Sequence, residues 1–253
     1  MRNRWGSAAL LCVSVLTFTA DSGIRASAAH DWSYEGEHGP EHWGAIKSEY
    51  ATCSTGKDQS PIDIRGATTA ALAPIAFDYH SATPDIVDNG HTIQVNVPSG
   101  SSITVGGRRY DLVQLHFHHP SEERIDGKGF AMVAHLVHKD ASGKLAVVAV
   151  LLREGKANPF LDTLWSHLPT VKEQVRTIEG VEISPDALLP ADRRYYTFQG
   201  SLTTPPCSEG VTWFVLETPM EVSSAQVATF AHLYSHNARP VQPRNGRVIQ
   251  ASK

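Results

Sequence analysis

Two histidines placed two residues apart, His116 and His118, are the side chains of this sequence best suited to hold a metal ion. Neutral imidazole is the commonest metal ligand in proteins, and the chain carries 13 histidines. In a β-strand, residues two apart face the same way, so both rings and the side chain of Gln114 would share one face. The pair can therefore converge on one ion, although exposed His-x-His pairs are also common on strands that bind no metal.

A third histidine, His135, lies in another apolar, strand-like segment, Phe130–His138. The residues between the two segments include Asp126-Gly127, a turn signal, so the segments can be antiparallel neighbours with His135 opposite the pair. Three nitrogen ligands suit tetrahedral zinc with the fourth position left for water, which is typical of a catalytic site. His138 has the opposite parity and is interpreted as a packed or surface residue, and His119 is also left outside the site.

The elements that must position these rings are mostly strands. Gly106-Gly107 is a hairpin turn signal between two strand-like segments. The run Leu145–Leu152 is apolar on both faces and is expected to be a central, covered strand. The strand-like segments are Ile93–Val97, Ser102–Val105, Arg109–Leu112, Leu112–His118, Phe130–His138, Leu145–Leu152 and Val211–Leu216.

Helical signals are fewer. Asn158-Pro159 is a cap followed by proline at the first helical position, and apolar residues then recur at helical spacing from Leu161 to Leu168. Ser224 is expected to cap a second helix that carries Val227 and Phe230. The sequence therefore predicts a mostly β, α+β architecture with a few peripheral helices.

Composition and charge restrict the class of protein. The chain has 253 residues, of which 41% are hydrophobic and 19% charged, as in ordinary globular proteins. Its formal net charge of −4 gives no electrostatic footprint for nucleic acid. No internal repeat, linker or charge block follows residue 29, so we expect one domain over residues 29–253.

Residues 1–28 have the three parts of a secretory signal peptide. Arg2 and Arg4 give a basic start, residues 5–20 are mostly apolar, and Ala26-Ser27-Ala28 is a small-x-small cleavage site. The alternative is a membrane anchor, but the apolar stretch is short for a span, which needs roughly 20 residues. We expect export of the mature chain to the periplasm, or secretion as the alternative, without attachment to a membrane.

The cysteine count agrees with export. Cys12 would leave with the signal peptide, so that Cys53 and Cys207 remain. Two cysteines in an oxidising compartment most often form one disulfide, and the alternative is two buried free thiols.

Seven short motifs follow one another along the chain: Trp32-Ser33-Tyr34, Gly39-Pro40-Glu41-His42-Trp43, Gln59-Ser60-Pro61-Ile62, Asn89-Gly90-His91, His116-Phe117-His118, His135-Leu136-Val137-His138 and Ser201-Leu202-Thr203-Thr204-Pro205-Pro206-Cys207. In this order and spacing they resemble the α-class carbonic anhydrases, in particular the exported bacterial branch. The resemblance covers nearly the whole of residues 29–253. It implies a lyase that hydrates CO₂ reversibly, built on a large central, twisted, mainly antiparallel sheet.

The resemblance also implies the catalytic groups. His116, His118 and His135 would bind one zinc ion per chain, and zinc-bound hydroxide would attack CO₂. Thr203 corresponds to the threonine that accepts a hydrogen bond from the hydroxide, and Glu122 to the glutamate that receives the hydrogen of the threonine. Together they would point an oxygen lone pair at the carbon atom. Sulfonamides and small anions are expected to inhibit at the zinc.

Proton export is assigned by the same resemblance. His91 matches the shuttle histidine, whose imidazole takes a proton through a water chain and passes it to buffer. Tyr34, Asn89 and Gln94 would order that water chain, although Gln94 stands where some members carry asparagine.

Other positions match parts of the substrate pocket and its supports. Gln114 can hold the second ring nitrogen of His116, and Cys53 and Cys207 match the disulfide of exported members, next to the threonine loop. The residues expected to contact CO₂ or bicarbonate are Val137, Val147, Leu202, Thr203, Thr204, Val211 and Trp213.

One position departs from the family pattern. In many animal members a glutamate two residues before the third ligand holds its second ring nitrogen, whereas here that position is Val133, which cannot accept a hydrogen bond. Partners of this kind tune metal affinity and ligand orientation. We therefore expect another acceptor for His135, which the sequence does not identify.

Two other functions remain open at this point. One is a catalytically inactive binding member of the same fold, although such relatives lose a zinc histidine and this chain keeps all three. The other is an exported zinc or copper sequestration protein that uses His30, His38 and His42. The resemblance leaves both a monomer and a homodimer open.

Overall fold

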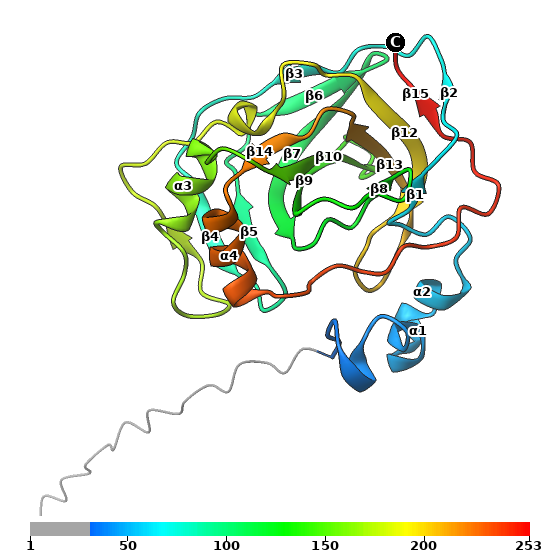
Figure 1. Ribbon diagram of the computed structural model, residues 1–253, viewed down its shortest axis with the longest axis horizontal. Coiled ribbons are helices and arrows are strands. Elements are labelled where there is room, and N and C mark those ends of the chain that lie inside the picture. Colours follow the sequence, from blue (N-terminus) through cyan, green and yellow to red (C-terminus); the bar gives the residue numbers. More distant parts are fainter. Residues whose placement is uncertain (1–30) are drawn as a thin grey trace, which may run out of the picture.

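The computed structural model describes residues 31–253, and the expected signal peptide over residues 1–28 lies outside this range. The described chain is a curved sheet with short helices near its surface (Figure 1). The helices are α1 (Trp43–Ile46), α2 (Thr52–Thr55), α3 (Pro159–Trp165) and α4 (Ser224–Leu233), with 3-10 turns at Gly36–His38, Ser48–Tyr50 and Pro185–Leu188. The strands are β1 (Asp63–Ile64), β2 (Thr68–Thr69), β3 (Ala76–Asp78), β4 (Asp85–Asp88), β5 (Ile93–Asn96), β6 (Ser102–Val105), β7 (Arg108–His118), β8 (Arg124–Ile125), β9 (Met132–Lys139), β10 (Leu145–Glu154), β11 (Arg176–Thr177), β12 (Tyr195–Ser201), β13 (Glu209–Leu216), β14 (Met220–Val222) and β15 (Gln250–Ala251).

Most strands belong to one large sheet. Its order is β11-β4-β5-β7-β9-β10-β13-β12-β15-β2. Off this path, β14 pairs with β10, and β6 pairs with both β7 and β3. The central neighbours β5, β7, β9 and β10 run antiparallel, and β10 and β13 run parallel. The expected mostly β architecture with a mainly antiparallel sheet and few peripheral helices is confirmed, as is the hairpin of β6 and β7 around Gly106-Gly107.

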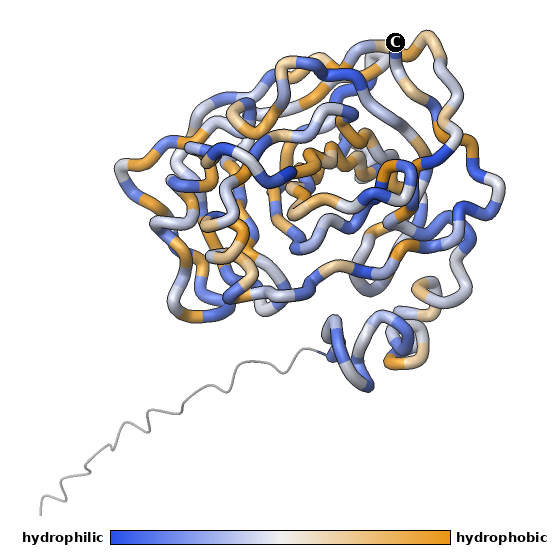
Figure 2. Tube along the Cα trace, in the orientation of Figure 1, coloured by the Kyte–Doolittle hydropathy of each residue, from blue (hydrophilic) through white to orange (hydrophobic). Residues whose placement is uncertain are grey.

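Strand β10 shows why the middle of the sheet is stable. Its side chains from residue 146 to 152 are 0–2% exposed, and they alternate between two apolar clusters on opposite faces of the sheet. Val148 and Val150 pack into one cluster, whereas Val147 and Ala149 pack into the other. A strand covered on both faces must be apolar throughout, as the sequence predicts for this run. The hydrophobic colouring of the central strands in Figure 2 follows this pattern.

Helices α3 and α4 lie side by side and cover one face of the sheet (Figure 1). The side chain of Asn158 accepts hydrogen bonds from the first turn of α3, as expected from the Asn-Pro pair. For α4 the expectation was wrong by one residue: Ser223, not Ser224, is the N-cap, and it forms a capping box with Gln226. Both helices pack on Phe117, through Trp165 and Phe230.

Phe117 belongs to the face of β7 opposite that of His116 and His118, because neighbouring residues of a strand alternate between faces. Helices α3 and α4 therefore do not pack on the histidine face of β7. His138 of β9 also lies away from that face: it is fully buried, and its Nε2 is 2.9 Å from the Tyr79 hydroxyl. The interpretation of His138 as a packed residue is confirmed.

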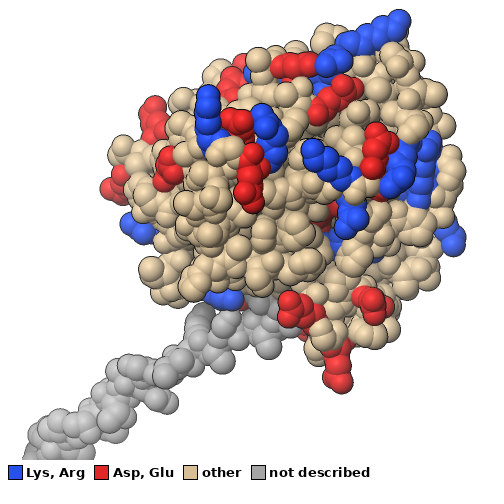
Figure 3. Space-filling view, in the orientation of Figure 1, with Lys and Arg blue, Asp and Glu red and all other residues tan. Residues whose placement is uncertain are grey.

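The surface carries both signs of charge. Acidic and basic side chains are interspersed on the face shown in Figure 3. Within residues 31–253, no helix combines the length and the apolar character that crossing a membrane would need.

Candidate metal centre

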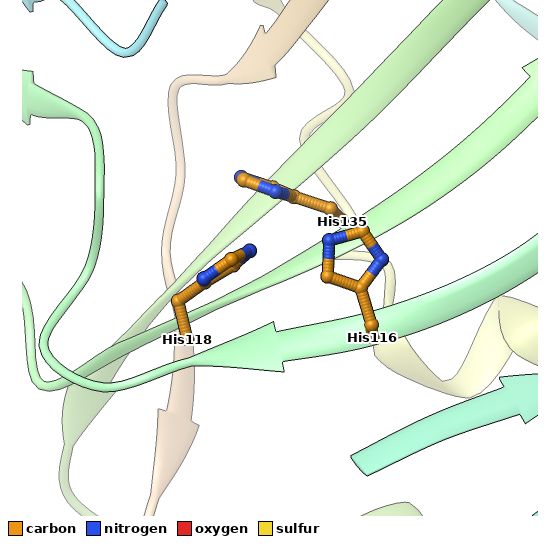
Figure 4. Close-up of side chains that lie close together, drawn as sticks. All are labelled: His116, His118 and His135. Carbon is orange, nitrogen blue, oxygen red and sulfur yellow. The ribbon is translucent and has the colours of Figure 1, made fainter. Parts of the chain in front are cut away.

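The three histidines singled out in the sequence meet on one face of the sheet. His116 of β7 stands directly opposite His135 of β9 in the antiparallel register, and His118 follows two residues later on the same face. One nitrogen from each ring lies within 4.8 Å of the others. Figure 4 shows the rings turned toward a common point. Within residues 31–253 these rings form the only cluster of three or more potential metal-ligating side chains, and no fourth ligand belongs to it.

Hydrogen bonds fix which nitrogen of the first two rings faces that point. Nδ1 of His116 lies 2.9 Å from Oε1 of Gln114, as the sequence suggested. Nδ1 of His118 lies 2.7 Å from the backbone carbonyl oxygen of Asn237. Each acceptor holds a hydrogen on Nδ1, so Nε2 keeps its lone pair for a metal. Nε2 of His118 is buried and has no hydrogen-bond partner within the described part of the chain, as expected of a metal-ligand atom.

In the third ring the hydrogen-bonded nitrogen is Nε2 instead of Nδ1. Nε2 of His135 lies 3.1 and 3.2 Å from the two carboxylate oxygens of Glu123, which leaves Nδ1 for the metal. Glu123 therefore supplies the hydrogen-bond acceptor for His135 that the apolar side chain of Val133 cannot provide. Two Nε2 atoms and one Nδ1 atom, without a fourth protein ligand in the cluster among residues 31–253, are a donor set that fits zinc.

The pKa values of the rings follow from their surroundings. Burial, reinforced by the neighbouring His135, lowers the pKa of His116 to about 3, and the same causes place the pKa of His118 well below its ordinary value. Both rings are therefore neutral at pH 7 and can donate lone pairs to a metal. Burial also acts to lower the pKa of His135, but the carboxylates of Glu123 and Glu122 more than offset it, so this pKa is raised.

Glu122 and Thr203 lie together beside the histidines. Glu122 is 2% exposed, and its Oε2 is 3.5 Å from Nε2 of His118 and 3.9 Å from Nδ1 of His135. Its Oε1 accepts a hydrogen bond of 2.8 Å from the backbone N–H of Arg239. Burial raises the pKa of Glu122 to about 7, against the lowering effect of hydrogen bonds that include one from the Thr203 side chain.

An apolar wall stands next to the rings. Val137, Val147 and Trp213 occupy one row across β9, β10 and β13, two residues along β9 from His135. The indole of Trp213 lies 5.0 Å from the His135 ring, centroid to centroid. The other residues expected in this wall, Val211 and Leu202, pack in the same apolar cluster. Thr204 lies in the loop that follows, where its carbonyl accepts a hydrogen bond from the backbone N–H of Cys207.

Two of the residues expected to carry protons away, His91 and Tyr34, line an open cavity. His91 lines this space of about 400 Å³ together with Tyr34, and its ring is stacked on Trp32 at 3.6 Å with an interplanar angle of 7°. The side-chain oxygen of Asn89 accepts hydrogen bonds from the backbone N–H of His91, and its amide group donates to Gln94. Asn89 therefore holds the loop that carries the imidazole.

Comparison with known proteins decides the family. A family model described as eukaryotic-type carbonic anhydrase matches residues 38–253. The carbonic anhydrase of Klebsiella pneumoniae is 47% identical over 252 residues, which cover 98% of this chain and 99% of that protein. The chain belongs to the α-carbonic anhydrase family.

Solved carbonic anhydrases have the same fold. One from Thermovibrio ammonificans, in complex with the inhibitor sulfanilamide, is 44% identical with a TM-score of 0.84, and the match covers 90% of this chain and all of that one. A hyperthermostable carbonic anhydrase from a hydrothermal vent chimney is 46% identical with a TM-score of 0.85, over 88% of this chain and 100% of that one. The expected family and enzyme class are thereby confirmed, and CO₂ hydration is the general activity of that family.

The cysteine pair of this carbonic anhydrase is a disulfide. Cys53 of α2 and Cys207 are bonded, with their Cα atoms 5.0 Å apart at a sequence separation of 154. Both carbonyl groups are also held, because Gln59 donates to that of Cys207 and Arg239 to that of Cys53. The bond therefore anchors the loop that carries Thr203 to the N-terminal segment.

Reduction of the disulfide is expected to lower the free energy of unfolding by about 5 kcal/mol, since the chain-entropy model gives a value of this size for so long a loop. Activity is expected to fall as well, because the threonine loop loses its anchor. Thermal unfolding and CO₂ hydration of the oxidised, reduced and Cys53→Ser/Cys207→Ser proteins measure both effects. Rapid labelling of two thiols in the native, unreduced carbonic anhydrase would contradict the bond.

Three groups of this carbonic anhydrase site were not singled out in the sequence: Glu123, Arg239 and the carbonyl of Asn237. The acidic pair Glu122-Glu123 directly after Pro120-Ser121 is visible in the sequence, but the family resemblance assigns a role only to Glu122. Nothing local marks Asn237 and Arg239, because they reach the site from more than 100 residues away in the chain.

Within residues 31–253, His38 and His42 belong to no cluster of potential metal ligands. His38 is exposed and its ring contacts the backbone carbonyl of Asp31, and His42 is also exposed. His30 lies outside the described residues.

Proposed function

We propose that this chain catalyses the reversible hydration of CO₂ to bicarbonate and a proton with one zinc ion held by His116, His118 and His135. The observation that carries the proposal is the convergence of these three rings, each with its other nitrogen held by an acceptor, in a chain of the carbonic anhydrase family. When bound there, zinc supplies a Lewis acid that brings the pKa of a water molecule near neutrality, as is established for carbonic anhydrases, in which this pKa is about 7.

Thr203 and Glu122 orient the nucleophile in this proposal. We assign to the Thr203 hydroxyl the donation of its hydrogen to the neighbouring Glu122 carboxylate, which leaves its oxygen only able to accept a hydrogen bond from the attacking oxygen. That restriction directs a lone pair of the nucleophile at CO₂. Arg239 keeps the carboxylate in place through its backbone N–H.

Thr203→Ala is expected to lower kcat/KM for CO₂ by about 100-fold, since the nucleophile loses the acceptor that orients it. Zinc content should stay at the parental value, because Thr203 is not a ligand. Thr203→Ser keeps the hydroxyl and should retain most of the activity. Stopped-flow CO₂ hydration and metal analysis of the three proteins measure this, and a Thr203→Ala enzyme within two-fold of the parent would remove the assignment.

The apolar wall provides a place for CO₂. The molecule carries no charge and has no strong hydrogen-bonding group, so a surface formed by Val137, Val147 and Trp213 accepts it without a specific ligand. Leu202, Val211 and Thr204 would complete the contact with substrate and product. The wall adjoins the rings, which places the carbon atom beside the nucleophile.

We assign the export of the proton to His91. An imidazole that titrates near neutral pH can take a proton through ordered water and release it to buffer. Two observations support this assignment. His91 lines an open cavity together with Tyr34, and Asn89 forms hydrogen bonds to the backbone of His91 and to the side chain of Gln94.

His91→Ala is expected to lower kcat about ten-fold in weak buffer, because proton transfer then becomes the slow step. Added imidazole should restore part of the rate by carrying the proton itself. His232→Ala, which removes an exposed histidine of α4, is the matched control and should behave as the parent. Equal rates of parent and His91→Ala at every buffer concentration would end the assignment.

The direct test of the proposed activity is a stopped-flow measurement of CO₂ hydration by the purified protein, with and without a sulfonamide. The sulfanilamide complex of the Thermovibrio ammonificans relative supports inhibition of the same kind here. A fast, sulfonamide-sensitive rate is expected. If folded, zinc-loaded protein hydrates CO₂ no faster than buffer alone, the chain is better described as a catalytically inactive binding protein of the same fold.

We further propose that residues 1–28 direct export to the periplasm and are removed, leaving an enzyme domain over residues 29–253. The disulfide supports an oxidising compartment.

A further inference from the structure

Glu123 is a buried carboxylate that pairs with one ring of the metal centre. It is 0% exposed, and its two oxygens lie 3.1 and 3.2 Å from Nε2 of His135. Within residues 31–253, His135 is its only ion-pair partner. A buried carboxylate without Arg or Lys beside it is costly, so its presence requires a specific compensating interaction.

The backbone around Glu123 is firmly held. The hydroxyl of Ser121 donates a hydrogen bond of 2.9 Å to the carbonyl of Glu123. The next residue, Arg124, begins β8 and donates its N–H to the carbonyl of Ile62. The carboxylate therefore reaches the histidine from a fixed segment between β7 and β8, not from β9 itself.

Strand β9 has no acceptor of its own for this ring. Val133 precedes His135 by two residues and shares its face of the strand, but its side chain is apolar and fully buried. The other two rings have neutral acceptors, the amide oxygen of Gln114 and the carbonyl of Asn237. Glu123 thus supplies the only charged acceptor among the three.

We propose that Glu123 is the positioning residue of His135. An ionised carboxylate only accepts hydrogen bonds, so it keeps the ring hydrogen on Nε2, fixes the rotation of the ring and leaves the Nδ1 lone pair for the metal. Its negative charge also offsets part of the charge of a bound dication. The inference rests on the proposed metal centre and assigns to a residue outside β9 the role that Val133 cannot fill.

Two substitutions separate the charge from the hydrogen bond. Glu123→Gln keeps an acceptor oxygen and removes the charge, whereas Glu123→Leu removes both. Loss of such a partner typically costs 10–100-fold in metal affinity, so we expect zinc to transfer to excess chelator about 10-fold faster from Glu123→Gln and about 100-fold faster from Glu123→Leu. Asp88→Asn, which alters a buried carboxylate bound to Gly90 and Tyr234, is the matched control and should release zinc at the parental rate.

A second readout distinguishes positioning from a structural role. Long-range ¹H–¹⁵N spectra of the zinc-loaded parent should place the ring hydrogen of His135 on Nε2, and those of His116 and His118 on Nδ1. In Glu123→Leu the His135 signal should lose its protection from exchange, while the other two stay. The metal-free Glu123→Leu protein should unfold at a lower temperature than the parent, because His135 loses its buried partner. The spectra and the rate of zinc release therefore carry the test, since a merely structural role would not change them.

Three results would overturn the inference: a His135 hydrogen on Nδ1 in the zinc-loaded parent, zinc release from folded Glu123→Leu within two-fold of the parent, or a large loss of metal-free stability with unchanged zinc release. If Glu123→Leu does not fold, the Glu123→Gln rate and the parental spectrum decide. A parent that binds no zinc would instead refute the proposed metal centre, and metal analysis of the parent identifies that case separately.

Discussion

Removal of the metal is expected to lower CO₂ hydration to the rate of buffer alone, a loss of at least about 10³-fold, and added zinc is expected to restore it. The pKa of bulk water is about 15.7, so hydroxide is scarce at neutral pH without a Lewis acid. Metal analysis and stopped-flow rates, taken before and after chelation, measure the effect.

A matched pair of substitutions on β9 tests whether the metal sits at the three rings. His135→Ala removes a ring of the cluster and should reduce bound zinc far below one ion per chain. His138→Ala removes a ring on the other face of the same strand, three residues away, where it contacts Tyr79. That variant should lose stability yet keep its zinc. Equal zinc loss in both, or full activity after complete metal removal, would contradict the proposed centre.

Val137→Tyr is expected to lower kcat/KM for CO₂ by about 100-fold or more while one zinc ion per chain remains bound. Val137 is half-buried in the row that runs from Gln114 through Val147 to Trp213, next to His135. A phenol ring in that row would fill the place proposed for CO₂, and displacement of a substrate by about 1 Å already costs about 100-fold. The expected signature is therefore a low kcat/KM at unchanged metal content.

The control for Val137→Tyr is the same substitution at Val248, which is 66% exposed and lies outside the strands. Val248→Tyr should leave rate and zinc content unchanged. Val137→Ile adds one methylene group to the wall and should give an intermediate rate. Unchanged turnover in Val137→Tyr, with the protein folded, would show that CO₂ does not occupy this wall.

Local patterns predicted the strands and the shared face of the histidines because strand geometry has a fixed period of two. His116 and His118 had to face the same way once residues 112–118 formed a strand, and the apolar run of β10 had to be covered on both faces. Capping chemistry located α3 correctly and missed the start of α4 by one residue, because Ser223 and Ser224 are both good caps and only the backbone decides between them.

By itself, the sequence determined the strand-dominated architecture, the two rings on one face of β7 and the choice of His135 as the third candidate metal ligand. Each of these depends on residues close together in the chain. Only the tertiary structure decided what holds the rings: the carbonyl of Asn237 for His118, Glu123 for His135, and Arg239 for Glu122. The physical reason is that hydrogen bonds depend on the distance between atoms in space. Segments separated by many residues come within that distance only when the sheet and its loops have packed together.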